Sequence, residues 1–174
     1  MGWLVRLMDK QCFLMMEQNE QYFTQLVREH KSTIYSVCYM FSNDKDEVED
    51  LFQEALINLW RGLPGFEGRS QVSSWVWRVT LNTCISADRK KRRNATVPLT
   101  MDIDLFDDSN AQGQQAQMLR ERIQRLQPFD RAIVLLWLEN MSYDEIAAIV
   151  GITAKNVGVR LYRIKEQLKQ MSNR

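Results

Sequence analysis

The chain has 174 residues, a length that allows one domain or two small ones. Hydrophobic residues make up 45% and charged residues 26%, as in soluble globular proteins, and no apolar run approaches the roughly 18 to 20 residues that span a bilayer. The formal net charge of +1 conceals basic blocks at 61–93 and 120–174 and acidic blocks at 44–60 and 94–119. The two basic blocks suggest two surfaces for a polyanion. The alternative is that these charges lie on solvated helix faces.

Residues 1–16 are mildly apolar, but Asp9 and Lys10 interrupt them and no small-residue cleavage site follows. We interpret this segment as a helical lead-in or a start-site artefact rather than a signal peptide. A first amphipathic helix is expected over 22–41, because its apolar residues recur at helical spacing. His30, the single histidine, lies on this apolar stripe, where a packed core or boundary role is expected.

A turn over 42–44 precedes the second expected helix, and Asp44 stands three residues before Glu47 as in a capping box. The apolar residues that follow advance in steps of three and one, which indicates an amphipathic helix: Val48, Leu51, Phe52, Ala55, Leu56, Leu59 and Trp60. The segment 62–65 contains two glycines and a proline and ends this helix.

A polar loop over 66–70 leads to a third helix, expected over 71–93. Residues 94–119 differ in kind, because they contain a proline, a glycine, a cluster of aspartates and few large apolar residues. We interpret them as a flexible acidic linker that becomes helical near Gln114. Helical periodicity resumes at Met118, breaks at Pro128 and continues over 130–139.

The last part of the chain carries a helix-turn-helix pattern. Residues 142–145 read Ser-Tyr-Asp-Glu, a second capping box that opens a short helix ending at Val150. Gly151 can take a positive φ at the turn, and Thr153 is placed to cap the next helix. The outward face of that helix offers cations and an amide that suit DNA, although a helical hairpin with an ordinary basic surface is the alternative: Lys155, Asn156, Arg160 and Arg163.

The expected fold class is therefore all-α, with two small helical domains joined by a flexible linker. The N-terminal lead-in covers 1–16, the first domain 17–95, the acidic linker 96–117 and the second domain 118–174. The three cysteines are odd in number and widely spaced, which fits neither a disulfide framework nor a paired zinc site. We expect no metal and no cofactor, and a reducing, cytoplasmic location.

Two segments of this sequence resemble the extracytoplasmic-function (ECF) class of bacterial sigma factors. Residues 49–93, which begin EDLFQEALINLW, resemble region 2 of that class, and residues 119–171, which include SYDEIAAIVGI, resemble region 4. The two matches stand in the family's order and are separated by a linker of suitable length. The resemblance implies a region 2 bundle and a region 4 helix-turn-helix.

The resemblance implies polymerase binding by an acidic patch on the second helix, formed by Asp50, Gln53 and Glu54. In the family this patch grips the clamp helices of core RNA polymerase. A solvated acidic helix face with favourable N-terminal charge is the alternative.

The resemblance further implies that the loop at 65–74 and the third helix bind and open the minus-ten promoter element. Strand opening requires that a base leaves the stack and is held in a pocket, with aromatic surfaces and cations for the exposed strand. Asn82 matches a family position implicated in base capture, Trp75 serves either the core or a base, and the basic run at 89–93 serves either phosphate or the helix terminus. The expected minus-ten residues are Phe66, Arg69, Ser73, Ser74, Trp75, Arg78, Asn82, Arg89 and Lys90.

The second helix of the helix-turn-helix departs from the family pattern. It reads AKNVGVRLYRIK, where many members carry a Gly-Thr-Val-Lys-Ser-Arg-like segment followed by Arg-Ala-Arg. The expected minus-thirty-five contacts, Lys155, Asn156, Arg160 and Arg163, therefore need not read the family's sequence. Gly158 inside this helix costs up to about 1 kcal/mol relative to alanine, and a close approach to the DNA backbone is one explanation.

The sequence thus predicts a promoter-specificity subunit that joins core RNA polymerase, docks on promoter DNA and helps melt it. RNA synthesis belongs to the polymerase, so we expect no enzyme activity and no small-molecule substrate. The family also implies sequestration by an anti-sigma factor. The alternative is a stand-alone helix-turn-helix regulator of duplex DNA, which leaves the acidic patch and one basic block without a role. A nuclease or other enzyme is not supported, because the sequence shows no histidine pair, nucleotide-binding glycine loop or nucleophile triad.

Overall fold

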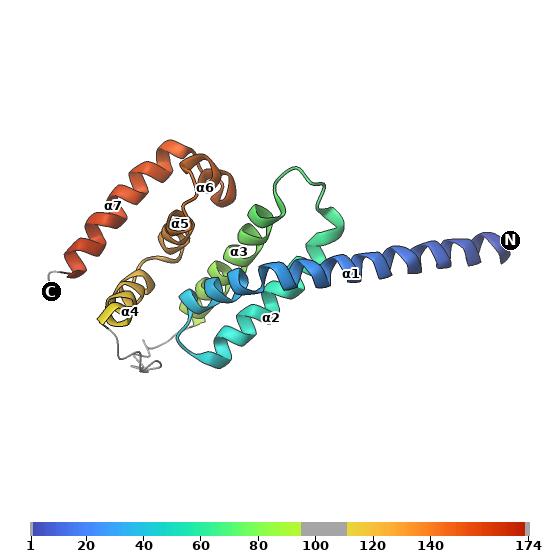
Figure 1. Ribbon diagram of the computed structural model, residues 1–174, viewed down its shortest axis with the longest axis horizontal. Helices are drawn as coiled ribbons and strands as arrows, with labels where there is room; N and C mark the ends of the chain where they lie inside the picture. The colour runs from blue at the N-terminus through green and yellow to red at the C-terminus, as the bar shows by residue number, and fades with distance from the viewer. Residues whose placement is uncertain (1, 95–110, 173–174) are drawn as a thin grey trace.

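The regular structure of the chain is helical throughout the part that the computed structural model describes, which is the backbone of 2–94 and 111–172 and the side chains of 19–93 and 114–172. In chain order these helices are α1 (Gly2–Phe41), α2 (Lys45–Gly62), the short 3-10 helix η1 (Leu63–Gly65), α3 (Val72–Asn94), α4 (Ala111–Gln124), α5 (Pro128–Leu138), α6 (Tyr143–Val150) and α7 (Ala154–Ser172). The expected all-α class is confirmed (Figure 1).

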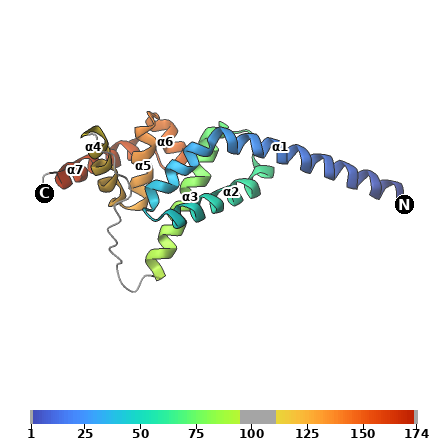
Figure 2. The same ribbon diagram turned by 60° about the horizontal axis from the view of Figure 1, so that its bottom comes forward.

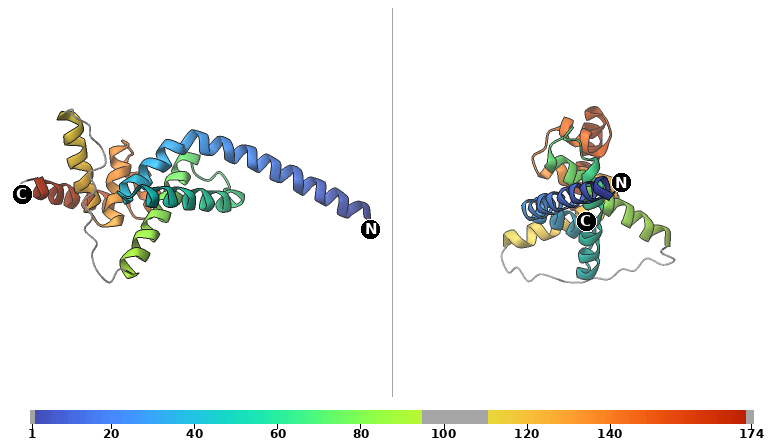
Figure 3. Two further views of the ribbon diagram at one scale, coloured as in Figure 1. Left: turned by 90° about the horizontal axis from the view of Figure 1, so that it is seen from below. Right: turned by 90° about the vertical axis from the view of Figure 1, so that its right-hand side faces the viewer.

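Helices α1, α2 and α3 pack against one another as a first bundle. The faces predicted from periodicity meet in its core, where Ile34, Val48, Ala55, Leu59 and Val76 are completely buried. The N-terminal part of α1 projects beyond the bundle as a single extended helix (Figures 1 and 3). The expected lead-in at 1–16 is therefore continuous with the first helix from Gly2 onward.

Helices α4 to α7 form the second unit, around the fully buried side chains of Leu126, Ile133 and Ile146. One expectation for this unit is wrong. Pro128 does not break the chain before a helix at Asp130 but is the first residue of α5. Proline is well tolerated there because the first amide of a helix has no intrahelical acceptor and the ring fixes φ near the helical value.

The two units lie against each other, with contacts of α3 to α5 and α6 and of α1 to α4 (Figure 2). Polar contacts cross this boundary: Gln124 donates to the carbonyl of Tyr39 at 3.3 Å, and Arg92 donates to the side-chain oxygen of Gln127 at 3.0 Å. The part of the expected linker (96–117) up to residue 110 lies outside the described residues. The part from Ala111 onward belongs to α4. Within the described part, no helix has both the length and the apolar character of a bilayer span.

Candidate functional site

The predicted acidic patch lies on the outward side of α2. Asp50, Gln53 and Glu54 are exposed, while their neighbours Leu51 and Ala55 are buried. Asp50 and Glu54 line one wall of a groove of about 500 Å³, and the facing wall comes from α3: Ser86, Ala87, Lys90 and Lys91. The groove therefore has an acidic wall and a basic wall, a combination that suits a partner carrying both charges.

Local hydrogen bonds fix the start of α2 beside this groove. The Asp44 carboxylate accepts from the amides of Asp46 at 2.9 Å and Glu47 at 3.0 Å, so the predicted cap forms. The Glu47 side chain does not close a capping box on Asp44. It accepts instead from the hydroxyl of Ser42 at 2.5 Å and from the ammonium of Lys91 at 2.9 Å, which ties α2 to the end of α3.

The loop before α3 brings two predicted aromatic residues together. The rings of Phe66 and Trp75 stand 5.0 Å apart, centroid to centroid, and both side chains are half-buried. A Cβ atom on Gly62 would lie 3.2 Å from the Trp75 ring, so this glycine allows the indole to pack closely against the end of α2. Trp75 thus has a packing role while part of its ring stays accessible.

The remaining predicted minus-ten residues lie along α3 and in the loop. Spacings of four and seven put Arg78, Asn82 and Arg89 on one side of α3, and all three are exposed, as is Lys90. Ser73 and Ser74 are half-buried in the first turn of α3, and Arg69 is exposed and paired with Glu67. Arg78 is engaged within the chain, because its guanidinium donates to the main-chain carbonyl of Ala148 in α6.

The helix-turn-helix forms as its local chemistry predicts. The hydroxyl of Ser142 accepts from the amide of Glu145 at 3.3 Å, and the Glu145 carboxylate accepts from the Ser142 amide at 2.8 Å, which completes the capping box. These hydrogen bonds hold the pKa of Glu145 below its ordinary value. Gly151 takes a φ of 76° at the end of α6, and the Thr153 hydroxyl caps α7 through the amide of Asn156 at 3.3 Å.

Helix α7 buries Val157, Leu161 and Ile164 against the second unit and turns its polar residues outward. The predicted contacts Lys155, Asn156 and Arg163 are exposed, and their side chains make no hydrogen bond or ion pair with any residue that the structure describes.

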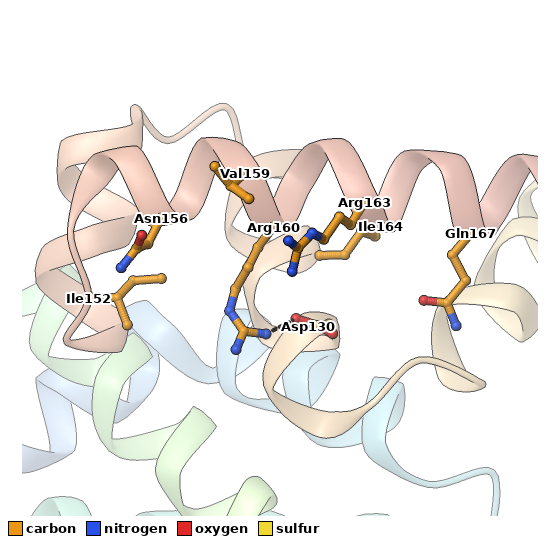
Figure 4. Close-up of a pocket in the computed structure, with 8 residues that line it drawn as sticks. All are labelled: Asp130, Ile152, Asn156, Val159, Arg160, Arg163, Ile164 and Gln167. Atoms are coloured by element: carbon orange, nitrogen blue, oxygen red, sulfur yellow. Dashed lines mark hydrogen bonds and ion pairs between the residues drawn. The ribbon is translucent and has the colours of Figure 1, made fainter.

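Arg160 differs from these three residues, because it reaches from α7 to α5 (Figure 4). Its guanidinium pairs with Asp130 at 2.5 Å and lies over the ring of Phe129 at 4.9 Å. Sequence reasoning missed both partners, which stand about thirty residues away in the chain. Together with Asn156 and Arg163, the pair Asp130–Arg160 lines a groove of about 460 Å³.

Two further residues of α7, Val159 and Gly158, lie beside the predicted contacts. Val159, which the sequence interpretation passed over, is 45% exposed on α7 and lines the same groove. Gly158 faces the ring of Tyr143, where an added Cβ would sit 3.4 Å from the nearest ring carbon, an ordinary contact. Across the described side chains, no three histidine, cysteine or acidic residues gather as a set that could hold a metal ion.

Comparison with protein families gives two matches along the chain. Residues 26–94 match the family model of sigma-70 region 2, and residues 116–168 match that of sigma-70 region 4. The first match covers α1 from Leu26 onward together with α2 and α3, and the second runs from Ala116 in α4 to Leu168 in α7 and includes the helix-turn-helix.

Similar proteins and structures point the same way. The chain is 28% identical to the ECF RNA polymerase sigma factor SigE of Mycolicibacterium smegmatis, over 83% of this chain and 59% of that protein. It is also 28% identical to the ECF RNA polymerase sigma factor SigW of Bacillus subtilis, over 85% of this chain and 87% of that protein. The fold resembles the sigma factor RpoE in complex with the anti-sigma factor NepR from Bartonella quintana, with a TM-score of 0.72, 20% identity, and coverage of 88% of this chain and 98% of that chain.

Proposed function

We propose that this chain, a member of the ECF class of the sigma-70 family, joins core RNA polymerase, contacts two promoter elements and helps melt one of them. The observation that carries this proposal is the pair of family matches in order, region 2 over 26–94 and region 4 over 116–168. RNA synthesis itself is the chemistry of the polymerase, so this subunit supplies binding and strand separation in the cytoplasm. The first domain, about 17–95, and the second, about 118–174, divide these tasks.

Core polymerase binds the acidic patch of Asp50, Gln53 and Glu54. The exposure of all three side chains supports this assignment, as does the charged groove that two of them share with Lys90 and Lys91. A partner helix that carries cations beside the acidic wall and an acid beside Lys91 would be complementary to both walls.

The minus-ten element meets the loop and the exposed side of α3. Phe66 and Trp75 offer accessible ring surface for a base, while Ser73, Ser74 and Asn82 offer hydrogen-bonding groups. Arg69, Arg78, Arg89 and Lys90 supply charge for the backbone of the separated strand. Binding at Arg78 requires that its hydrogen bond to α6 opens.

The minus-thirty-five element meets α7 in the major groove. Asn156 and Arg163 have free hydrogen-bonding groups suited to purine edges, whereas the ammonium of Lys155 suits phosphate. Arg160 exchanges its pairing with Asp130 for a contact with DNA or keeps it and orients α7.

An anti-sigma factor is the proposed regulator, since the similar RpoE structure contains one. An apolar groove of about 230 Å³ lies where α1, α3, α4 and α5 meet, and it offers such a partner a surface between the two domains. Its lining includes Val37, Trp77, Leu119 and Leu138.

Run-off transcription tests the proposal. Purified core polymerase is supplied with fragments of the source genome, with and without this chain, and discrete transcripts that require the chain are the expected result. A folded chain that yields no transcripts and fails to bind core polymerase overturns it in favour of a stand-alone DNA-binding regulator.

A second experiment tests the polymerase patch. The double variant Asp50→Ala/Gln53→Ala should bind core polymerase at least tenfold more weakly with unchanged helical content. Glu29→Ala removes an exposed acid from α1 and serves as the control, with unchanged affinity. Equal affinity for the double variant and the control removes the patch from the interface.

A further inference from the structure

Val159 occupies the centre of the outward face of α7. The buried residues Val157, Leu161 and Ile164 mark the opposite side, and Val159 is 45% exposed. At 100° per residue it points almost directly away from that buried side. Asn156 lies one turn before it and Arg163 one turn after it, so the three side chains form one strip.

Packing within the chain does not explain a valine at this position. Its side chain is outside the core, and β-branched residues are weaker helix formers than the alanine, lysine or glutamine that an exposed helical position usually favours. The neighbours on the strip are polar. A single aliphatic group is therefore held between two hydrogen-bonding side chains (Figure 4).

The major groove of DNA offers one apolar feature at the edge of a base, the C5 methyl group of a pyrimidine. Hydrogen-bond donors and acceptors occupy the other positions. A helix that inserts its outward face into this groove brings the centre of that face closest to the bases. An aliphatic side chain there strengthens binding when it covers a methyl group and weakens binding when it covers a polar base edge that is left without a hydrogen bond.

We propose that Val159 is a specificity-determining residue of this chain, which selects a thymine by contact with its C5 methyl group. Asn156 and Arg163 read the bases on either side of it. The inference rests on the proposed promoter binding through α7 and adds to it the chemistry that one position prefers. The same methyl group on 5-methylcytosine is the second source of this chemistry, and the experiment separates the two.

The experiment uses the holoenzyme, formed from the full chain and core polymerase. Selection from a random duplex library first gives the preferred minus-thirty-five sequence. Each thymine of that element is then replaced singly by uracil, which removes the methyl group and leaves the hydrogen-bonding edge unchanged. Affinity is measured by fluorescence anisotropy for the wild-type chain, for Val159→Ala and for Met118→Ala, a control in which a similarly exposed apolar residue is shortened on α4.

One thymine-to-uracil replacement should weaken DNA binding by the wild-type and Met118→Ala holoenzymes about fourfold, the effect of one buried methyl group. Val159→Ala should bind both duplexes equally. A cytosine at that position should bind better when it carries a 5-methyl group, and only for chains with Val159.

Two results overturn the inference while leaving the proposed function intact: a selected element in which no thymine responds to loss of its methyl group, or a response that persists in Val159→Ala. Failure of the holoenzyme to select any sequence counts instead against the proposed function.

Discussion

Arg131 and Met40 are separated by 91 residues in sequence, yet the guanidinium Nη1 of Arg131 donates a hydrogen bond of 3.3 Å to the Met40 carbonyl. The Nη2 atom of the same group donates to the carbonyl of Leu126 at 3.1 Å and to that of Gln124. One side chain from α5 thus joins the last turn of α1 to the end of α4. Burial of Arg131, which is 4% exposed, lowers the pKa of its guanidinium.

Arg131→Met should lower the free energy of unfolding by about 3 kcal/mol, because buried carbonyls lose their donor. Arg131→Lys should also destabilise, since one ammonium cannot reach carbonyls on both helices. Urea denaturation followed by circular dichroism measures both effects. Arg125→Met, at an exposed arginine just beyond α4, is the control and should change stability by less than about 0.5 kcal/mol. Equal losses at Arg131 and Arg125 would contradict the structural role.

Arg78→Ala separates folding from promoter opening. The side chain is exposed, so its loss, including the bond to Ala148, should change the free energy of unfolding by less than about 1 kcal/mol. If Arg78 holds the minus-ten strand, permanganate reactivity of the opened thymines should fall about tenfold. Arg61→Ala removes an exposed arginine from the last turn of α2 and should leave opening unchanged. A similar loss of opening in both variants would point to general charge.

The capping box of α6 predicts a dependence of stability on pH. The pKa of Glu145 is lower in the folded chain than its ordinary value of 4.5, because Ser142 hydrogen-bonds to the carboxylate. This contribution is present above about pH 4.5 and is lost as the pH falls through the folded pKa. Ser142→Ala should therefore destabilise the chain at pH 7 and lose much of that effect in acid.

Urea unfolding of wild type and Ser142→Ala between neutral and acid pH tests this dependence, together with an NMR titration of Glu145. The titration should give a higher pKa in the variant. Ser32→Ala, at an exposed serine inside α1, should give a difference from wild type that does not vary with pH. A constant effect of Ser142→Ala would show that the carboxylate contributes nothing.

Two glycines of the helix-turn-helix should respond in opposite directions to alanine. Gly158 lies inside α7 and has room for a Cβ beside Tyr143, so Gly158→Ala should stabilise the chain by about 0.5 to 1 kcal/mol. Gly151 has a φ of 76°, and Gly151→Ala should destabilise by about 1 kcal/mol. Thermal unfolding compares the two. Loss of stability in Gly158→Ala would contradict the space seen beside Tyr143.

Sequence patterns predicted the features that depend on neighbouring residues. The cap at Asp44, the capping box at Ser142 and the positive φ of Gly151 each follow from chemistry within a few residues. The expected helix at 71–93 is observed at Val72–Asn94 for the same reason. At Pro128 the sequence predicted a break with a helix from Asp130, whereas α5 begins at Pro128 itself, because proline is well tolerated in the first turn of a helix.

The contacts between helices that lie far apart in the sequence were not predictable from it. The bond of Arg78 to Ala148 joins residues 70 apart, and the pair of Arg160 and Asp130 joins residues 30 apart. Such pairs form only after the helices have packed, and periodicity does not identify which outward cation meets which acceptor. For the same reason, the sequence placed Arg160 on the DNA-facing surface without showing its partner on α5.

The thiols of Cys38 and Cys84 lie 4.0 Å apart where α1 meets α3, and both are buried. The hydrogen bond to Cys38 and burial raise the pKa of Cys84, so little reactive thiolate is available to solvent in the folded bundle. The sequence has no cysteine after position 84. In a Cys12→Ser background, the rate of pulse alkylation would therefore report the opening of the first bundle alone, independent of events in the helix-turn-helix.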